Sequence, residues 1–372
     1  MKKSFSAIKC ILGLGVCLAL ASCQFGRMVI YNVADIRDYK KFPSRPLVKS
    51  DTPFLFYQPK GKGKTPKTIT PENGKTMNFD DYLAKNKTVA FLIIQNDTIQ
   101  YERYFNGYSR SSIVPSFSMA KSFTSILIGC ALDDGLIHSV DDPVTRYIPE
   151  LKKNGFDSVS IEDLLQMTSG LKFSERYFNP FSEVAKFYYG RHLEKDVLKL
   201  KLKDKPETVF NYKSGNTEIL GLILKRVLKD KSITQYFQEK VWTPLHMEYD
   251  ASWSLDRKEG LEKTFCCVNA RAIDFAKIGR LYLHQGEWQG QEIVQPDWVR
   301  QSTEMDTTKG SAWFYQYQWW LPTNTGDFYA DGLLGQFIYV NPAKKLIIVR
   351  LGKDFGKGLD WPQLFVGLAK EY

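Results

Sequence analysis

Residues 115–124 read Pro115-Ser116-Phe117-Ser118-Met119-Ala120-Lys121-Ser122-Phe123-Thr124 and open a strongly apolar segment. Apolar residues then recur at helical spacing up to Leu132, which predicts a buried helix with Ser118 and Lys121 in its first turn. Positions i and i+3 of a helix share a face, so the serine hydroxyl would lie beside the lysine amine. Burial lowers the pKa of a lysine, and a neutral lysine can accept the proton of a serine. The segment therefore predicts an activated nucleophile at Ser118.

The pattern Ser-x-x-Lys is informative only in its context. It occurs three times, at Ser6 with Lys9, Ser118 with Lys121, and Ser169 with Lys172. The first pair lies in the leader, and Gly170 interrupts the third. Only the second pair therefore opens an apolar helix. The alternative interpretation of the second pair is a serine that caps a helix and a lysine whose amine reaches solvent.

The N-terminus has the pattern of an export signal. Three lysines precede an apolar run from Cys10 to Ala21, which is too short to span a bilayer. The run ends in Leu20-Ala21-Ser22-Cys23, which resembles the lipobox of bacterial lipoproteins. The resemblance implies that residues 1–22 are a signal peptide and that acyl chains on Cys23 anchor a periplasmic or surface-facing protein to the membrane. The alternatives are an ordinary cleaved leader and an uncleaved anchor.

The charge of the chain does not indicate a nucleic-acid partner. The formal net charge is +10, and it falls to +7 without the leader lysines Lys2, Lys3 and Lys9. A basic cluster between Lys60 and Lys67 lies in a stretch rich in Gly, Pro and Thr, as in a solvated linker near an anionic membrane. No nucleic-acid motif is present. Residues 23–84 therefore read as a lipidated tether and an N-terminal extension.

The cysteines and histidines predict neither a disulfide framework nor a metal site. Of six cysteines, two would leave with the leader and one would be lipidated, which leaves Cys130, Cys266 and Cys267. Neighbouring cysteines rarely bond each other, so we expect stability to come from the apolar core. The four histidines lack ligand spacing, and we expect no cofactor.

Strand patterns at both ends of the domain flank a helical middle. A buried strand, a tight turn and an alternating strand are predicted at 88–95, 96–97 and 98–105. Helices are predicted at 161–169, over much of 183–238 including 217–227, at 270–283 and from 362 onward. Further strands are predicted at 316–321, 335–340 and 346–351. The order predicts one sheet built from both chain ends with a helical insertion.

Three elements in this order resemble a known group of enzymes. They are Ser118-x-x-Lys121, Tyr212 on a loop before a helix, and the run from Ala330 to Gln336 entering a strand. This arrangement resembles the penicillin-recognising serine hydrolases, which include class C β-lactamases, DD-peptidases, family VIII esterases and aminohexanoate-oligomer hydrolases. The resemblance covers residues 85–372. It implies an α/β (α+β) fold of the β-lactamase/transpeptidase type, with an antiparallel sheet flanked by helices and a mainly helical subdomain at about 140–285.

The resemblance also implies the roles of individual residues. Ser118 would be the nucleophile, activated by Lys121 and Tyr212, with Tyr212 a base only if the Lys121 ammonium favours its phenolate. The backbone N–H groups of Ser118 and Leu333 would form the oxyanion hole. The residues that would contact substrate are Tyr177, Ser214, Asn216, Gly335 and Gln336.

Two departures from the family pattern bear on the substrate. Ala330 stands where relatives often carry Lys or His, which removes the cation expected to hold a β-lactam or peptide carboxylate. Ser214 replaces the asparagine of the Tyr-x-Asn motif. The sequence thus favours a serine hydrolase that cleaves a small ester or amide through an acyl-enzyme. A DD-peptidase or β-lactamase is one alternative, and a non-catalytic binding or sensor module of the same fold is another. The oligomeric state is left open.

Overall fold

The computed structural model describes residues 26–27, 31, 33–61, 63–70, 74–356 and 358–372. The predicted signal peptide and Cys23 lie outside the described residues. Within the described part of the chain, no helix is both long enough and apolar enough to cross a bilayer.

The main sheet joins the two ends of the domain. It has seven antiparallel strands in the order β13-β14-β15-β16-β17-β4-β5. The C-terminal β17 pairs directly with the N-terminal β4, which confirms the predicted sheet. The strands are β4 (Thr88–Gln95), β5 (Thr98–Tyr104), β13 (Tyr315–Gln316), β14 (Trp319–Trp320), β15 (Phe328–Gly332), β16 (Gln336–Asn341) and β17 (Leu346–Gly352).

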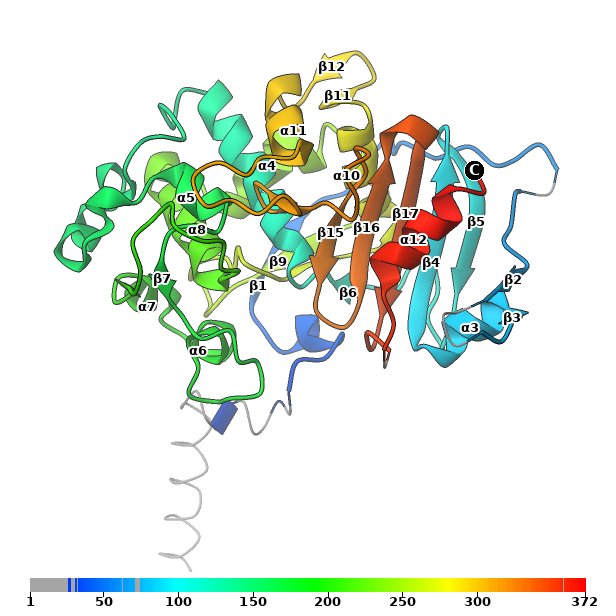
Figure 1. The fold of residues 1–372 in the computed structure, drawn as a ribbon, viewed down its shortest axis with the longest axis horizontal. Helices are drawn as coiled ribbons and strands as arrows, with labels where there is room; N and C mark the ends of the chain where they lie inside the picture. Colours follow the sequence, from blue (N-terminus) through cyan, green and yellow to red (C-terminus); the bar gives the residue numbers. More distant parts are fainter. Residues whose placement is uncertain (1–25, 28–30, 32, 62, 71–73, 357) are drawn as a thin grey trace, which may run out of the picture.

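Helices cover both faces of this sheet, and this explains the continuous apolar run of β4. Phe91 and Ile93 pack on one face with α3 (Phe79–Lys85) and α12 (Trp361–Ala369), which crosses the sheet in Figure 1. Leu92 and Ile94 point into the larger core on the other face, where α10 (Ala272–Leu283) packs on β16, β17 and β4. A strand buried on both faces has no polar alternation.

The helical part lies beside the sheet (Figure 1). Its centre is α8 (Ser214–Leu228), which packs against α4 (Met119–Asp133), α5 (Ile161–Leu165) and α9 (Ile233–Phe237). Three further α-helices are α6 (Glu183–Tyr189), α7 (Leu193–Val197) and α11 (Pro296–Thr303). The predicted helical insertion is therefore confirmed.

A second, four-stranded sheet contains the strand that precedes Ser118 in the chain. Its order is β1-β9-β10-β6, from β1 (Ser44–Leu47), β9 (Ala251–Ser254), β10 (Val268–Ala270) and β6 (Val114–Pro115). The N-terminal extension supplies β1, so this segment is paired to the domain at that point. The division of the chain at residues 84 and 85 stays a prediction. Three two-stranded ribbons complete the fold, β2 (Thr68–Ile69) with β3 (Met77–Asn78), β7 (Leu171–Lys172) with β8 (Lys201–Leu202), and β11 (Glu287–Trp288) with β12 (Gln291–Glu292).

Two predicted elements are shorter than expected. The predicted strand at 316–321 is a tight hairpin, because Tyr317 and Gln318 adopt positive φ angles of 38° and 73°. The predicted helix at 161–169 ends at Leu165, and Met167 then has a φ of 60°. An L-residue with positive φ cannot continue a strand or a right-handed helix.

Two helical glycines offer a test of the packing between α10 and the sheet. A Cβ on Gly279 would lie 2.9 Å from Ile338 Cγ2 and 3.0 Å from Ile347 Cγ2, whereas a Cβ on the exposed Gly367 of α12 would meet nothing within 4 Å. Gly279→Ala should therefore lower the free energy of unfolding by about 1–3 kcal/mol through overpacking. The matched control Gly367→Ala should raise it by about 0.5–1 kcal/mol. Urea unfolding of both variants measures the difference, and equal signs would contradict the close contact.

Candidate active site

Ser118 is the accessible point of an otherwise buried segment. From Val114 to Ala131 it is the single residue that is not buried. It is the N-cap of α4, yet its side chain makes no capping hydrogen bond, so the hydroxyl is available to other partners. The preceding Phe117 has a φ of 44°, an uncommon conformation for a residue with a side chain.

Lys121 lies behind this hydroxyl and is 1% exposed. Its Nζ is 2.9 Å from Ser118 Oγ, and it donates a second hydrogen bond of 2.9 Å to the Phe265 carbonyl. Burial lowers the pKa of the Lys121 amine from 10.5 to about 8. The interpretation of this pair as a capping serine with a solvent-exposed lysine is therefore wrong.

The loop that contains Phe265 is held by α4 and α8. Glu218 of α8 is fully buried and accepts hydrogen bonds from the Thr264 backbone N–H and hydroxyl. Thr124, one turn after Lys121, donates to the Thr264 carbonyl at 2.9 Å. These contacts fix the carbonyl that orients the Lys121 amine.

Tyr212 reaches the same hydroxyl from the loop that precedes α8. Its side chain is hydrogen-bonded to Ser118, and Lys121 Nζ lies 5.0 Å from its ring centroid. Burial, together with the Glu175 carboxylate, raises the pKa of Tyr212 well above 10. The phenol is therefore held neutral, contrary to the condition under which the sequence made it a base. Of Lys121 and Tyr212, Lys121 is the one whose pKa lies close to neutral pH.

Leu333 lies in the hairpin between β15 and β16, beside Ser118. A Cβ on Gly332 would come within 2.2 Å of the Ser116 carbonyl, so only glycine allows this close approach of the hairpin to the Ser118 turn. Leu333 and Ser118 line one cavity. The two residues thus lie on neighbouring segments, and their role as an oxyanion hole stays a prediction.

Two carboxyl groups that the sequence analysis did not assign flank the site. Glu175 accepts hydrogen bonds from the Ser214 N–H at 3.0 Å, from the Ser214 hydroxyl, and from the Tyr177 hydroxyl at 2.9 Å. Burial raises the pKa of Asp331 to about 7, although the Lys121 charge opposes this shift. Asp331 Oδ1 is buried and has no hydrogen-bond partner among the described residues. The proximity of Glu175 to Tyr177 in the chain was the available signal.

The predicted substrate-binding residues divide into two sets. Tyr177 and Ser214 line the cavity beside Ser118. Asn216 is fully buried and bonds Ser169 Oγ and Met167 Sδ instead. The Gln336 amide bonds the Leu333 and Gly352 carbonyls, and the Gly335 carbonyl accepts from Arg350. Asn216, Gln336 and Gly335 thus make hydrogen bonds within the protein, and they do not line the cavity.

The cavity has a volume of about 100 Å³. None of the described residues that line it carries a charge. Its lining is Val33, Ala34, Phe117, Ser118, Tyr177, Phe178, Val184, Ala185, Tyr188, Tyr189, Ser214, Phe265, Cys266, Leu333 and Leu334.

Cys266 and Cys267 form a disulfide, contrary to the expectation from the sequence. Cys267 has a φ of 79°, and this sharp turn of the backbone brings neighbouring side chains together. The disulfide directly follows Phe265, whose carbonyl binds Lys121, and Cys266 lines the cavity. Cys130 is a buried free thiol.

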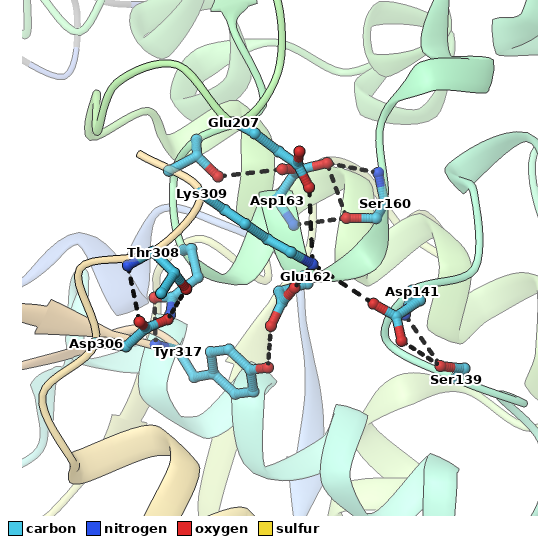
Figure 2. A network of polar contacts seen from close by, with 12 residues as sticks. Ser139, Asp141, Ser160, Glu162, Asp163, Glu207, Asp306, Thr308, Lys309 and Tyr317 are labelled. Carbon is cyan, nitrogen blue, oxygen red and sulfur yellow. Dashed lines mark hydrogen bonds and ion pairs between the residues drawn. The ribbon is translucent and has the colours of Figure 1, made fainter. Parts of the chain in front are cut away.

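A separate polar cluster surrounds Lys309 (Figure 2). Lys309 Nζ lies 2.7 Å from Glu162 and 3.7 Å from both Asp141 and Glu207, and the Tyr317 hydroxyl donates to Glu162 at 2.9 Å. The cluster thus ties the segment around the β13–β14 hairpin to the start of α5. On that hairpin, the rings of Tyr315 and Trp320 pack 5.9 Å and 5.5 Å from the Tyr212 ring. Across the described residues, no group of three or more His, Cys, Asp or Glu side chains is arranged to hold a metal.

Sequence similarity identifies the family of the chain. The chain belongs to the beta-lactamase family, whose model matches residues 78–364. It is 28% identical over 295 residues to the 6-aminohexanoate-dimer hydrolase of Paenarthrobacter ureafaciens, covering 74% of each chain.

Solved structures show the same fold. A candidate 6-aminohexanoate-dimer hydrolase from Bacillus anthracis superimposes with a TM-score of 0.79 at 23% identity, covering 93% of this chain and 94% of that one. A family VIII carboxylesterase superimposes with a TM-score of 0.61 at 17% identity, covering 78% and 93%. A penicillin-binding protein from Bacillus halodurans gives 0.61 at 15% identity, covering 79% and 99%.

The electrostatics of Lys121 can be measured without any substrate. In heteronuclear NMR of labelled lysine side chains, we expect Lys121 to titrate near pH 8, well below an ordinary lysine at 10.5. Glu175→Gln should lower the pKa of Lys121 further, because the Glu175 carboxylate is the largest of the charges that favour the ammonium. Lys172→Ala, an exposed lysine of the other Ser-x-x-Lys pair, should leave the titration unchanged. A Lys121 signal that titrates above pH 10 would contradict the buried amine.

Proposed function

We propose that this protein hydrolyses an uncharged ester or amide through an acyl-enzyme on Ser118. The observation that carries the proposal is the contact of 2.9 Å between the accessible Ser118 hydroxyl and the buried Lys121 amine. An amine whose pKa is about 8 is neutral in a substantial fraction of molecules near physiological pH. It can therefore take the serine proton as attack begins.

The reaction follows from the positions of the three side chains. Ser118 Oγ attacks the carbonyl carbon while its proton passes to Lys121 Nζ. The bond to the leaving oxygen or nitrogen then breaks, and the neutral Tyr212 phenol gives that atom a proton and regains one from the Lys121 ammonium. Water then attacks the acyl carbon while its proton passes to Lys121 Nζ. The bond between the acyl carbon and Ser118 Oγ breaks, and the Lys121 ammonium returns this proton to Ser118 Oγ, which restores the hydroxyl.

The charge that develops on the carbonyl oxygen needs hydrogen-bond donors. The backbone N–H groups of Ser118 and Leu333 are the candidates, since both residues line the cavity. Removal of one such donor typically costs about 100- to 1000-fold in rate.

The surroundings favour a substrate without a carboxylate. Ala330 supplies no cation, and the neighbouring Asp331 places a carboxyl group beside Lys121. Both this group and Glu175 act electrostatically on Lys121, so they would also disfavour a substrate carboxylate placed close to it. This argues against the DD-peptidase and β-lactamase alternatives, and the likeness to an aminohexanoate-dimer hydrolase supports an amide as one possible bond type.

The alternative of a non-catalytic binding module has less support. A binder needs no lysine of lowered pKa behind an accessible serine, and burial of such an amine is unfavourable.

We further propose that Cys23 is lipidated and holds the hydrolase at a membrane outside the cytoplasm. The disulfide between Cys266 and Cys267 supports export, because disulfides persist mainly in oxidising compartments.

The catalytic proposal predicts the behaviour of three variants on p-nitrophenyl esters. Ser118→Ala and Lys121→Ala should lower kcat/KM by roughly 1000-fold or more, because each removes a member of the nucleophilic pair. Tyr212→Phe should lower it by about 100- to 10,000-fold, the usual range for a lost proton donor. Lys172→Ala is the matched lysine control and should retain full activity. An active Ser118→Ala protein, or an inert wild type, would leave the binding module as the better hypothesis.

The charge of the site predicts discrimination between two esters with the same leaving group. We expect kcat/KM for p-nitrophenyl acetate to exceed that for mono-p-nitrophenyl glutarate by tenfold or more, because like charges repel in a buried site. Asp331→Asn should reduce this ratio, whereas Asp157→Asn, an exposed residue with the same change of charge, should not. Equal rates on both esters, or an unchanged ratio in Asp331→Asn, would contradict the electrostatic argument.

A further inference from the structure

The N-terminal extension forms part of the wall of the Ser118 cavity. Val33 and Ala34 line it, although the family match begins only at residue 78. We propose that these two residues determine specificity by limiting the length of the apolar group that the substrate places in the cavity. This inference rests on the proposed function, because it assigns a substrate class to the same site.

The lining of the cavity is mostly apolar. The polar side-chain atoms of its lining are hydroxyl groups of serines and tyrosines. Those of Tyr177 and Ser214 are already bonded to Glu175, and that of Tyr188 is bonded to Asp38. Most of the other lining side chains are aliphatic or aromatic, including Val184, Ala185 and Leu334. A charged or strongly polar group would find no partner there, and burying it unpaired is unfavourable. Each methylene that fits should instead favour binding by about fourfold.

The volume sets a length for this group. An apolar protein cavity of about 150 Å³ accommodates benzene, which corresponds to about 25 Å³ per carbon atom. The cavity beside Ser118, at about 100 Å³, therefore has room for about four carbon atoms. We infer a short, unbranched aliphatic group, bonded either to the scissile carbonyl or to the leaving atom.

Several contacts hold the extension in this position. The buried Asp38 accepts a hydrogen bond of 2.7 Å from the hydroxyl of Tyr188, which itself lines the cavity. Lys41 pairs with Asp38 at 2.7 Å, and the Phe42 ring packs edge-on against Tyr188 with centroids 5.1 Å apart. The amine of the buried Lys263 lies 3.1 Å from the centroid of the Phe42 ring. Val33 and Ala34 thus belong to an anchored segment.

The test varies the length of the substrate on each side of the scissile bond. One series is p-nitrophenyl esters from acetate to octanoate, and the other is acetate esters of linear alcohols from methanol to octanol. Ala34→Leu fills the cavity and should lower kcat/KM for the hexanoate or hexyl ester at least tenfold, with the shortest ester changed less than about twofold. Val33→Ala enlarges the cavity and should move the optimum to a longer chain. Ala343→Leu, at an exposed turn, is the matched control and should keep the wild-type profile.

The outcomes separate this inference from the catalytic proposal. A change confined to the acyl series or to the alcohol series supports the wall and shows which side of the substrate occupies the cavity. Equal losses on all chain lengths, or wild-type length profiles in both variants, overturn it. If the wild type hydrolyses no ester, the proposed function fails. In that case, the binding of linear amides from propanamide to octanamide to the Ser118→Ala protein tests whether Val33 and Ala34 limit the chain length that the cavity accepts. The inference is supported if adding Ala34→Leu shortens the longest amide that binds, and it is overturned if that length stays unchanged.

Discussion

Burial of the Lys121 amine is the constraint on which the rest of the site depends. A lysine that is 1% exposed has lost its hydration, and only two hydrogen bonds of 2.9 Å, to Ser118 Oγ and the Phe265 carbonyl, replace it. Removing a charge from water is unfavourable, so the neutral amine is favoured and its pKa falls to about 8. The same burial that seals the core beneath α4 thus prepares a proton acceptor beside an accessible hydroxyl.

Elements that are distant in the chain keep this arrangement in place. Glu218 of α8 holds the Thr264 backbone next to Phe265, and α8 also follows the loop that carries Tyr212. The pairing of β17 with β4 joins the chain ends, and the β15–β16 hairpin then lies against the Ser116 carbonyl at Gly332. The site is therefore assembled from segments that are far apart in the chain.

Charge and shape divide the selection of a substrate between two sides of the site. Glu175 and Asp331 lie near the Lys121 amine, and their ionised forms stabilise its ammonium and oppose a carboxylate on the substrate. The cavity itself is uncharged, and the N-terminal extension completes its wall. The polar cluster around Lys309 has a supporting role, because it anchors the segment whose aromatic rings pack against Tyr212.

The amino-acid sequence alone determined the features that arise within short stretches of chain. The apolar spacing after Pro115 places Ser118 and Lys121 on one helical face, and the continuous apolar run at 88–95 is β4 without any shift of its bounds. The motifs also predicted that Tyr212 and the hairpin at Leu333 would join them. Only the tertiary structure decided that Glu175 and Asp331 flank the amine, that Asn216 and Gln336 turn inward, and that Ala34 reaches the cavity. Local patterns report which face of an element is buried, whereas the neighbours and charges that set a pKa come from segments far apart in the chain.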